Sequence, residues 1–180
     1  MHTELSAPSP WLVRWSHLIP AQASVLDLAC GTGRHMQWLQ SQGCSVLGVD
    51  RDEAALHIAQ QFGEIVCADV ENTAWPLANH QFDAVVVFNY LWRPTWPHML
   101  ACLKPNGVLI YETFASGNES VGKPSRPDFL LNRAELLQRC TDLRVVAYED
   151  VFLSSPDRYV QRIVAVKSNS HLERFAGSGL

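Results

Sequence analysis

The chain has 180 residues, a length typical of one domain around a single core. Hydrophobic residues make up 47% of it, which excludes a disordered chain. The formal net charge of −4 gives no basic footprint for bulk nucleic acid, so nucleic acid is disfavoured as a partner and only a local basic patch stays open.

The five cysteines are odd in number and show no CxxC spacing. We therefore expect reduced, mostly buried thiols in a cytoplasmic protein, with neither a disulfide framework nor a metal site. Residues 1–20 lack a basic start followed by an apolar stretch, so we expect no signal peptide. No run has the length of a membrane span, so we expect no membrane partner.

The spacing of apolar residues predicts alternating helices and strands. The first helix begins at Pro10, with Ser9 as its N-cap. A second capped helix runs from Asp52 through Gln61. The remaining elements, in chain order, are a strand at 25–29, a helix at 34–42, strands at 45–49, 64–68 and 82–88, a helix from about 95, and a strand at 108–114.

The chain after residue 114 changes character. Residues 115–128 form a long irregular segment with two glycines and two prolines, and segments of this kind are usually functional or mobile. Asn132 and Glu135 resemble a capping box that starts a helix to Cys140. Residues 143–153 and 158–166 alternate in polarity and predict an antiparallel hairpin.

These elements predict an α/β fold, a Rossmann-like, doubly wound, mostly parallel sheet. We expect about seven strands, with the last hairpin antiparallel, and helices on both faces. The expected domains are an N-terminal helix packed on the core over 1–20, a main domain over 21–167, and a flexible tail over 168–180.

Polar residues follow strand after strand at what should be one edge of this sheet. A glycine turn follows the first strand, and Asp50, Asp69 and Asn89 follow the next three, with Glu112 near the end of the fifth. Ligands of such sheets bind beyond the carboxyl ends of the strands. The glycines lack the Lys of a P-loop, and Met36 stands where a dinucleotide fingerprint has its third glycine, so both of those ligand classes lose support.

The stretch "VLDLACGTGRHMQWL" at 25–39 resembles motif I, D-x-x-x-G-x-G, of the class I S-adenosylmethionine-dependent methyltransferases. Asp27, Gly31 and Gly33 match it residue by residue. Asp50 matches the acidic residue that ends the second strand in that family. "CADVE" at 67–71 resembles its adenine-facing segment, and "FDAVVVFNYL" at 82–91 resembles its motif IV. The resemblance covers residues 20–115 and implies S-adenosylmethionine as cofactor.

The resemblance also implies roles for individual residues. Amides of the glycine turn and of the helix beginning near Arg34 would take the cofactor's carboxylate. Asp27 would accept from its ammonium group, Asp50 from the ribose hydroxyls, and Asp69 from the adenine amino group, beside the Val70 amide. The full set of expected cofactor-binding residues is Asp27, Ala29, Gly31, Gly33, Asp50, Arg51, Asp69, Val70 and Asn89.

Each of these positions has a structural alternative. Asp27 would cap its own turn, and Asp50 and Asp69 would cap helices or end loops. Cys30 fills space rather than acting as a nucleophile, because no partner histidine stands at motif distance. His35 would either line the cleft or face solvent, and the sequence does not separate the two.

Methyl transfer from a sulfonium needs alignment and exclusion of water, so a dedicated base is optional. We expect the acceptor beyond the fourth and fifth strands. There Glu112 is the best-placed general base. Tyr90 is a second candidate catalytic residue, which with Trp92 would shape an apolar pocket unless both belong to the core. Arg93, Lys123 and Arg126 would meet an anionic acceptor or remain solvated, and residues 115–128 would act as a lid.

Two motifs and the compactness of the chain bear on the acceptor class. "NYLW" lacks the prolines of motif IV in enzymes that methylate amides or exocyclic amines, which disfavours those acceptors. "YETF" with its glycine- and proline-rich loop resembles small bacterial methyltransferases of the tellurite-resistance and thiopurine type. Because the chain is compact, with no appended recognition domain, we expect a small-molecule acceptor. The alternatives are an RNA or protein methyltransferase acting with a partner subunit, and a non-catalytic cofactor-binding module.

Overall fold

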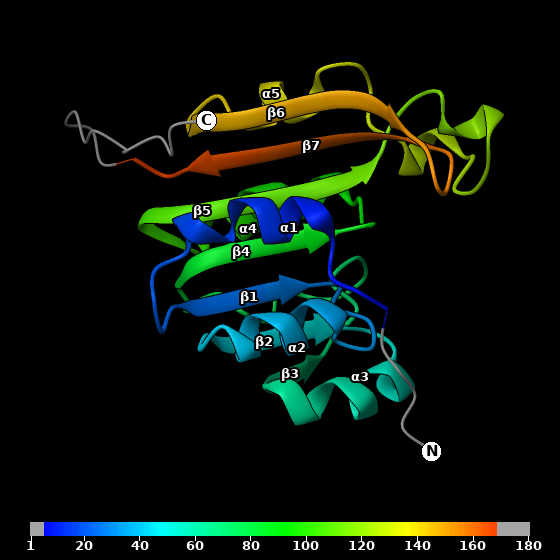
Figure 1. Cartoon of the computed structure of the whole chain (residues 1–180). Coiled ribbons are helices and arrows are strands. Elements are labelled where there is room, and N and C mark those ends of the chain that lie inside the picture. The colour runs from blue at the N-terminus through cyan, green and yellow to red at the C-terminus, as the bar shows by residue number, and fades with distance from the viewer. Residues whose placement is uncertain (1–5, 169–180) are drawn as a thin grey trace.

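The computed structural model describes residues 6–168, which form one twisted sheet covered by helices (Figure 1). The sheet has seven strands in the order β3-β2-β1-β4-β5-β7-β6. The strands are β1 Ser24–Leu28, β2 Ser45–Asp50, β3 Glu64–Cys67, β4 Phe82–Phe88, β5 Leu103–Phe114, β6 Arg144–Leu153 and β7 Arg158–Val166. The predicted Rossmann-like fold is confirmed.

The strands from β3 to β5 run parallel, and β7 pairs antiparallel with both β5 and β6. The parallel strands and β6 therefore end at the same edge of the sheet. β2 and β3 lie on one side of β1, and β4 and β5 lie on the other side. The direction in which the chain adds strands to the sheet therefore reverses at β1. A ligand site is expected beyond the strand ends at this point.

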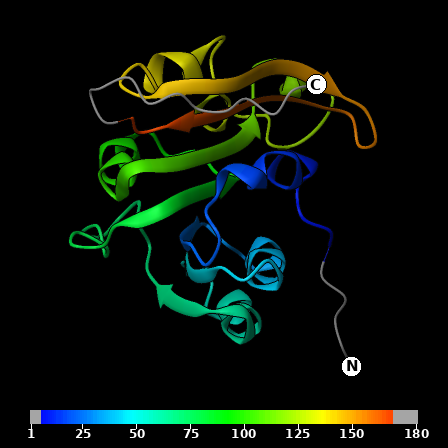
Figure 2. The same cartoon turned by 60° about the vertical axis from the view of Figure 1, so that its left-hand side comes forward.

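The helices form two groups on opposite faces of the sheet, as the view in Figure 2 shows. α1, α2 and α3 cover one face, and α4 and α5 cover the other. The helices are α1 Pro10–Trp15, α2 Arg34–Ser41, α3 Glu53–Ala59, α4 Trp96–Ala101 and α5 Glu135–Arg139. Short 3-10 turns follow α1 and α3, and one precedes α4.

The two faces carry two separate apolar clusters because side chains alternate along each strand. Val25 packs under α1 and α2, whereas its neighbour Leu26 packs toward the face of α4 and α5. Strands of this kind are buried on both faces, which explains the apolar run of β4 from Ala84 to Phe88.

The predicted cap of α1 is confirmed. The Ser9 side chain accepts a hydrogen bond from the Trp11 amide, and Pro10 occupies the first helical position. The Trp11 indole donates to the Ile163 carbonyl at 3.4 Å, and the Arg162 guanidinium lies 4.6 Å from the Trp11 ring centre. The N-terminal helix is therefore fastened to β7.

Two predicted boundaries are wrong. β5 begins at Leu103 rather than at residue 108. Residues 104–107, which were expected to form a turn, belong to the strand, and the pairing of β4 with β5 shifts register between Phe82 and Ala84 of β4. Asn132 does not cap α5, since the helix begins at Glu135 and Ala134 before it has a left-handed φ of 58°. The Glu135 carboxylate does accept from the Asn132 amide at 2.9 Å, which is half of the expected capping box.

The expected flexible tail from 168 onward lies outside the described residues, apart from Ser168 itself. No helix in the described part is long and apolar enough to cross a membrane. The five cysteines are free thiols.

Candidate functional site

A cavity of about 260 Å³ lies at the carboxyl ends of β1, β2 and β4 and beside the chain that follows β3. Its lining consists of Leu28, Ala29, Val49, Asp50, Arg51, Ala68, Asp69, Val70, Glu71, Asn89 and Tyr90. Asp50, Asp69 and Asn89, predicted to share one edge of the sheet, therefore do meet there, whereas Gly31, Gly33 and Glu112 are not part of this lining.

The glycine turn between β1 and α2 has an unusual backbone. Ala29, Gly31 and Gly33 all have positive φ values, of 58°, 54° and 83°. A Cβ atom on Gly33 would lie 2.9 Å from the Ala59 Cβ, so this glycine also allows α3 to pack closely against the turn. Left-handed backbone at a non-glycine residue such as Ala29 is uncommon and marks the start of the cavity wall.

Asp50 organises the turn from the end of β2. Its carboxylate accepts hydrogen bonds from the Gly31 amide at 2.8 Å and the Asp52 amide at 3.0 Å. A carboxylate has about four acceptor positions, so Asp50 retains capacity for a ligand in the cavity that it lines.

The glycine amides themselves are engaged within the protein. The Gly31 amide donates to Asp50, and the Gly33 amide donates to the Cys30 carbonyl at 3.0 Å. Both amides therefore have protein partners in this structure, and their contact with a ligand carboxylate stays a prediction. The other predicted donors to this carboxylate are the amides in the first turn of α2, which begins at Arg34.

Asp27 lies beneath the turn rather than in the cavity lining, with 1% of its surface exposed. Its Oδ2 atom is buried and has no hydrogen-bond partner among the described residues. Burial raises the pKa of this carboxyl to about 8, the charge of Asp50 adds to the shift, and Arg34 opposes it. An orphaned carboxyl oxygen next to the turn fits a cationic ligand group.

Asp69 supports its own turn, as the structural alternative foresaw. Its oxygens accept from the Asn72 side chain at 2.8 Å and the Glu71 amide at 3.1 Å. These hydrogen bonds, that of Asn72 first, lower the pKa of Asp69. Asp69 also lines the cavity beside Val70, so a structural role and a ligand role are compatible at this position.

The far wall of the cavity is built by Asn89 and Tyr90. The chain leaves β4 through Asn89, whose φ of 56° is left-handed and whose amide donates to the Glu112 carbonyl. The Tyr90 hydroxyl is buried without a hydrogen-bond partner in the described structure. Burial, with smaller contributions from Glu71 and Asp69, raises the pKa of Tyr90 above its usual value, so this hydroxyl keeps its proton at neutral pH.

The cavity favours a positively charged ligand. Its lining includes the carboxylates of Asp50, Asp69 and Glu71 but a single guanidinium, that of Arg51. Such a site repels the two negative charges of a pyrophosphate and attracts an ammonium or sulfonium group. No cluster of three or more metal-ligating side chains occurs among residues 6–168.

The Glu112 side chain lies beneath the start of α1 and outside the cavity lining. It is 6% exposed, accepts from the Ser9 hydroxyl at 3.4 Å and pairs with Arg162 at 3.4 Å. Its side chain is not part of the cavity lining, contrary to the position that the sequence suggested. The proposed role of Glu112 as general base stays a prediction.

His35 is buried against the Phe88 ring, 4.2 Å between centres, and neither lines the cavity nor faces solvent. Burial lowers its pKa to about 3, so the ring is neutral and its Nε2 atom accepts from the Ser9 amide at 3.2 Å. Cys30 is buried too, and burial raises the pKa of its thiol, which agrees with a space-filling role.

The cations expected to meet an anionic acceptor divide into two kinds. Arg93 is engaged by Glu135 at 2.8 Å and is not free for a ligand. Arg126 is exposed and pairs with Asp128, and Lys123 contacts the Ser125 hydroxyl. None of the residues from 115 to 128 contributes to the described cavity lining.

Four lining residues were not predicted individually: Leu28, Val49, Ala68 and Glu71. Each lies within two positions of a predicted one, and their types carry no chemical signal, apart from the carboxylate of Glu71. Glu71 belongs to the segment "CADVE", in which Asp69 alone was predicted to contact the ligand through its side chain.

Comparison with known proteins agrees with this geometry. Residues 25–107 match a family model described as a methyltransferase domain. The relative named "Putative methyltransferase YqeM", from Bacillus subtilis, is 30% identical over 132 residues, which cover 64% of this chain and 53% of that protein. The chain spans about half the length of the curated relatives it matches.

Solved structures show the same fold. TehB from Haemophilus influenzae superimposes with a TM-score of 0.76 at 18% identity, covering 91% of this chain and 64% of that one. A TehB-like S-adenosylmethionine-dependent methyltransferase from Corynebacterium glutamicum gives a TM-score of 0.64 at 20% identity, covering 88% and 87%. At these identities the likenesses show that the chain has the fold of these methyltransferase structures, and the family model matches its residues 25–107.

Proposed function

We propose that this chain transfers the methyl group of S-adenosylmethionine to a small-molecule acceptor. The observation that carries the proposal is the negatively charged cavity at the switch point of the sheet, with Asp50 in its wall and the orphaned carboxyl of Asp27 beneath the glycine turn. The family model supports methyl transfer in general, and the acceptor is part of the proposal.

The residues present fit the cofactor group by group. Asp50 has acceptor capacity for the two ribose hydroxyls, and Asp69 with the Val70 amide would recognise the adenine. Asp27 would accept from the ammonium group, which satisfies its free oxygen. When bound, S-adenosylmethionine supplies a methyl group already activated by its sulfonium.

The protein's own task is then alignment and exclusion of water. Tyr90 remains protonated and lies in the cavity wall, so it would donate a hydrogen bond or shield the methyl group rather than act as a base. An acceptor that arrives deprotonated, or that carries a neutral nucleophile, needs no base from the protein.

A small acceptor is favoured over RNA by the charges near the cavity. Arg51 is the single cation in its lining, and Arg93 and Arg162 are both held in ion pairs. RNA binding requires a track of available cations along the phosphate backbone. The described lining, with one cation beside three carboxylates, does not supply such a track.

The test is a screen of a metabolite extract with methyl-labelled S-adenosylmethionine, run beside total transfer RNA and a protein extract. The proposal predicts label in a low-molecular-weight product that depends on the protein. Label in RNA or protein alone would contradict the proposed acceptor class. Binding of the cofactor without transfer to any fraction would support a non-catalytic module instead.

A further inference from the structure

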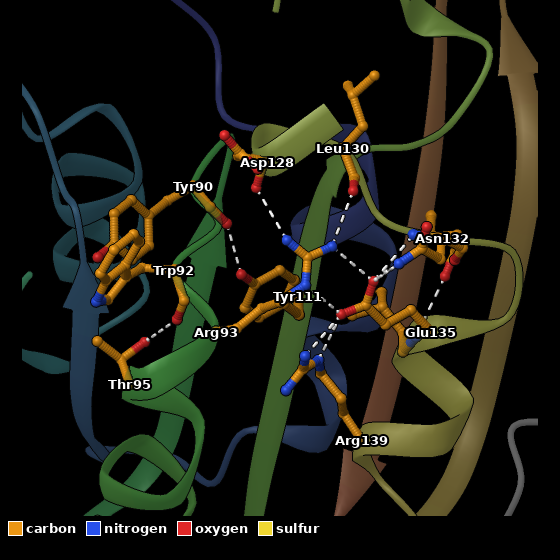
Figure 3. A network of polar contacts seen from close by, with 12 residues as sticks. Tyr90, Trp92, Arg93, Thr95, Tyr111, Asp128, Leu130, Asn132, Glu135 and Arg139 are labelled. Atoms are coloured by element: carbon orange, nitrogen blue, oxygen red, sulfur yellow. Dashed lines mark hydrogen bonds and ion pairs between the residues drawn. The ribbon is translucent and has the colours of Figure 1, made fainter. Parts of the chain in front are cut away.

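Arg93, three residues beyond Tyr90, has an unusually complete set of hydrogen bonds (Figure 3). Its Nε and Nη2 atoms donate to the two carboxylate oxygens of Glu135, both at 2.8 Å. Its Nη1 atom donates to the Asp128 carbonyl at 2.9 Å, and Nη2 also donates to the Leu130 carbonyl at 3.0 Å. One side chain thus ties the segment after β4 to two segments that follow β5.

Glu135 is held just as firmly. It is 5% exposed and accepts from Arg93, Arg139 and the Asn132 amide. Burial opposes its charge, but the hydrogen bonds from Arg93, the Asn132 amide and Arg139 outweigh burial and lower its pKa to about 2. The pair therefore stays ionised at any working pH, and its two-pronged geometry requires a guanidinium.

The same segment is also fixed next to the cavity. The Tyr111 hydroxyl donates to the Tyr90 carbonyl at 2.5 Å, as Figure 3 shows. Tyr111 is 2% exposed and stacks on the Trp96 ring at 4.9 Å. The chain between Tyr90 and Arg93 is thereby held at both ends, while the Tyr90 side chain lines the cavity and makes no hydrogen bond through its buried hydroxyl.

We propose that Arg93 is a positioning residue, which holds Tyr90 in the wall of the cofactor cavity by fastening residues 89–93 to residues 127–135. The inference rests on the proposed function, because it concerns the same cavity. A partly buried ion pair such as Arg93–Glu135 adds little net stability, since desolvation of the charges opposes it, but it fixes geometry well. The Tyr90 hydroxyl has no hydrogen-bond partner among residues 6–168, so the ring depends on its packing against the apolar core and on the backbone that carries it.

The test measures affinity for S-adenosylhomocysteine by calorimetry in four proteins: the unaltered chain, Arg93→Lys, Tyr90→Ala and the double variant. We expect Arg93→Lys to raise Kd about tenfold in the unaltered background and less than twofold in the Tyr90→Ala background, because Arg93 acts through Tyr90. An equal rise in both backgrounds, or no rise in either, would overturn the proposal. Arg126→Lys is the control, since Arg126 is exposed and makes only local contacts, with the Asp128 carboxylate and the Phe129 ring.

A second measurement needs no ligand. Amide hydrogen exchange of the unliganded protein should become faster in residues 89–93 and in residues 127–132 together when Arg93 becomes Lys. Unchanged exchange in residues 89–93 would overturn the inference even if no cofactor binds. Failure of the unaltered chain to bind S-adenosylhomocysteine would instead contradict the proposed function. If Arg93→Lys does not fold, Glu135→Gln, which keeps the volume and removes the charge, should show the same pattern.

Discussion

The carboxylate of Asp50, at the end of β2, accepts a hydrogen bond from the amide of Gly31, in the turn after β1, at 2.8 Å. This contact joins two motifs that lie 19 residues apart in the chain. The residue expected to hold the ribose therefore also sets the shape of the glycine turn.

Replacing Asp50 by Ala should raise the Kd for S-adenosylmethionine at least tenfold, since both the ligand contact and the turn are lost (about 1.4 kcal/mol or more). Calorimetric titration measures the change. Asp83→Ala is the matched control, because Asp83 accepts two hydrogen bonds from Ser24 at 2.8 Å but follows the start of β4, at the opposite edge of the sheet. The control should lose stability and keep its affinity. An unchanged Kd in Asp50→Ala would remove Asp50 from the site.

Asp27 should release a proton when the cofactor binds. Its pKa of about 8 leaves it mostly protonated at pH 7, and the ligand's ammonium group favours the ionised form. Titrations with S-adenosylhomocysteine in buffers of different ionisation enthalpy should show release approaching one proton per site at pH 7. Asp27→Asn should abolish this release. Release that persists in the variant would assign the proton to another group.

The same residue makes a prediction for the unliganded protein. The folded pKa of Asp27 lies above its ordinary value of 3.8, so the folded state binds more protons than the unfolded state between about pH 4 and pH 8. Stability should therefore fall as pH rises through this window. Melting temperatures from pH 5 to pH 8 should decline for the unaltered chain and decline less for Asp27→Asn. A parallel decline in both proteins would contradict the assignment.

The glycines of the turn should differ in their tolerance of a side chain. Gly31→Ala introduces a methyl group into open space and is opposed only by the left-handed φ, so it should cost about 1 kcal/mol of unfolding free energy. Gly33→Ala adds a collision with Ala59 and should cost roughly 1–3 kcal/mol more. Gly43→Ala, with positive φ and open space away from the cavity, is the control and should match Gly31→Ala. Equal losses at Gly33 and Gly43 would contradict the packing argument. Denaturant unfolding measures all three.

Glu112→Gln separates two roles for this carboxylate. A general base predicts a loss of methyl transfer of about 100-fold. The ion pair with Arg162 predicts retained transfer and a modestly lower melting temperature, because the guanidinium loses one of its two carboxylate partners, Glu112 at 3.4 Å, and keeps Glu149. Since the carboxylate is buried outside the cavity lining, we expect the second result, measured with the acceptor found by the metabolite screen. A large loss of transfer in a normally stable variant would restore the base role.

The fold and the cavity edge were predictable because their signals are local. The apolar run of β4, the Asp52 cap of α3 and the glycine turn each depend on a few neighbouring residues, and parallel strands bring their ends to one edge. Asp50, Asp69 and Asn89 could therefore be placed together from the sequence.

The parts that the sequence did not reveal depend on partners far along the chain. Glu112 seemed to point toward the site, but the alternation of β5 turns it under α1, where Ser9 and Arg162 hold it. Arg93 seemed free for an anionic acceptor, but Glu135, 42 residues away, engages it. Neither contact leaves a periodic or spaced pattern in the sequence.

Competitive calorimetry with S-adenosylhomocysteine and NADH tests the central claim most directly. The negatively charged cavity and the orphaned carboxyl of Asp27 predict one tight site for S-adenosylhomocysteine and no measurable binding of NADH. Tight binding of NADH together with no binding of S-adenosylhomocysteine would contradict the account.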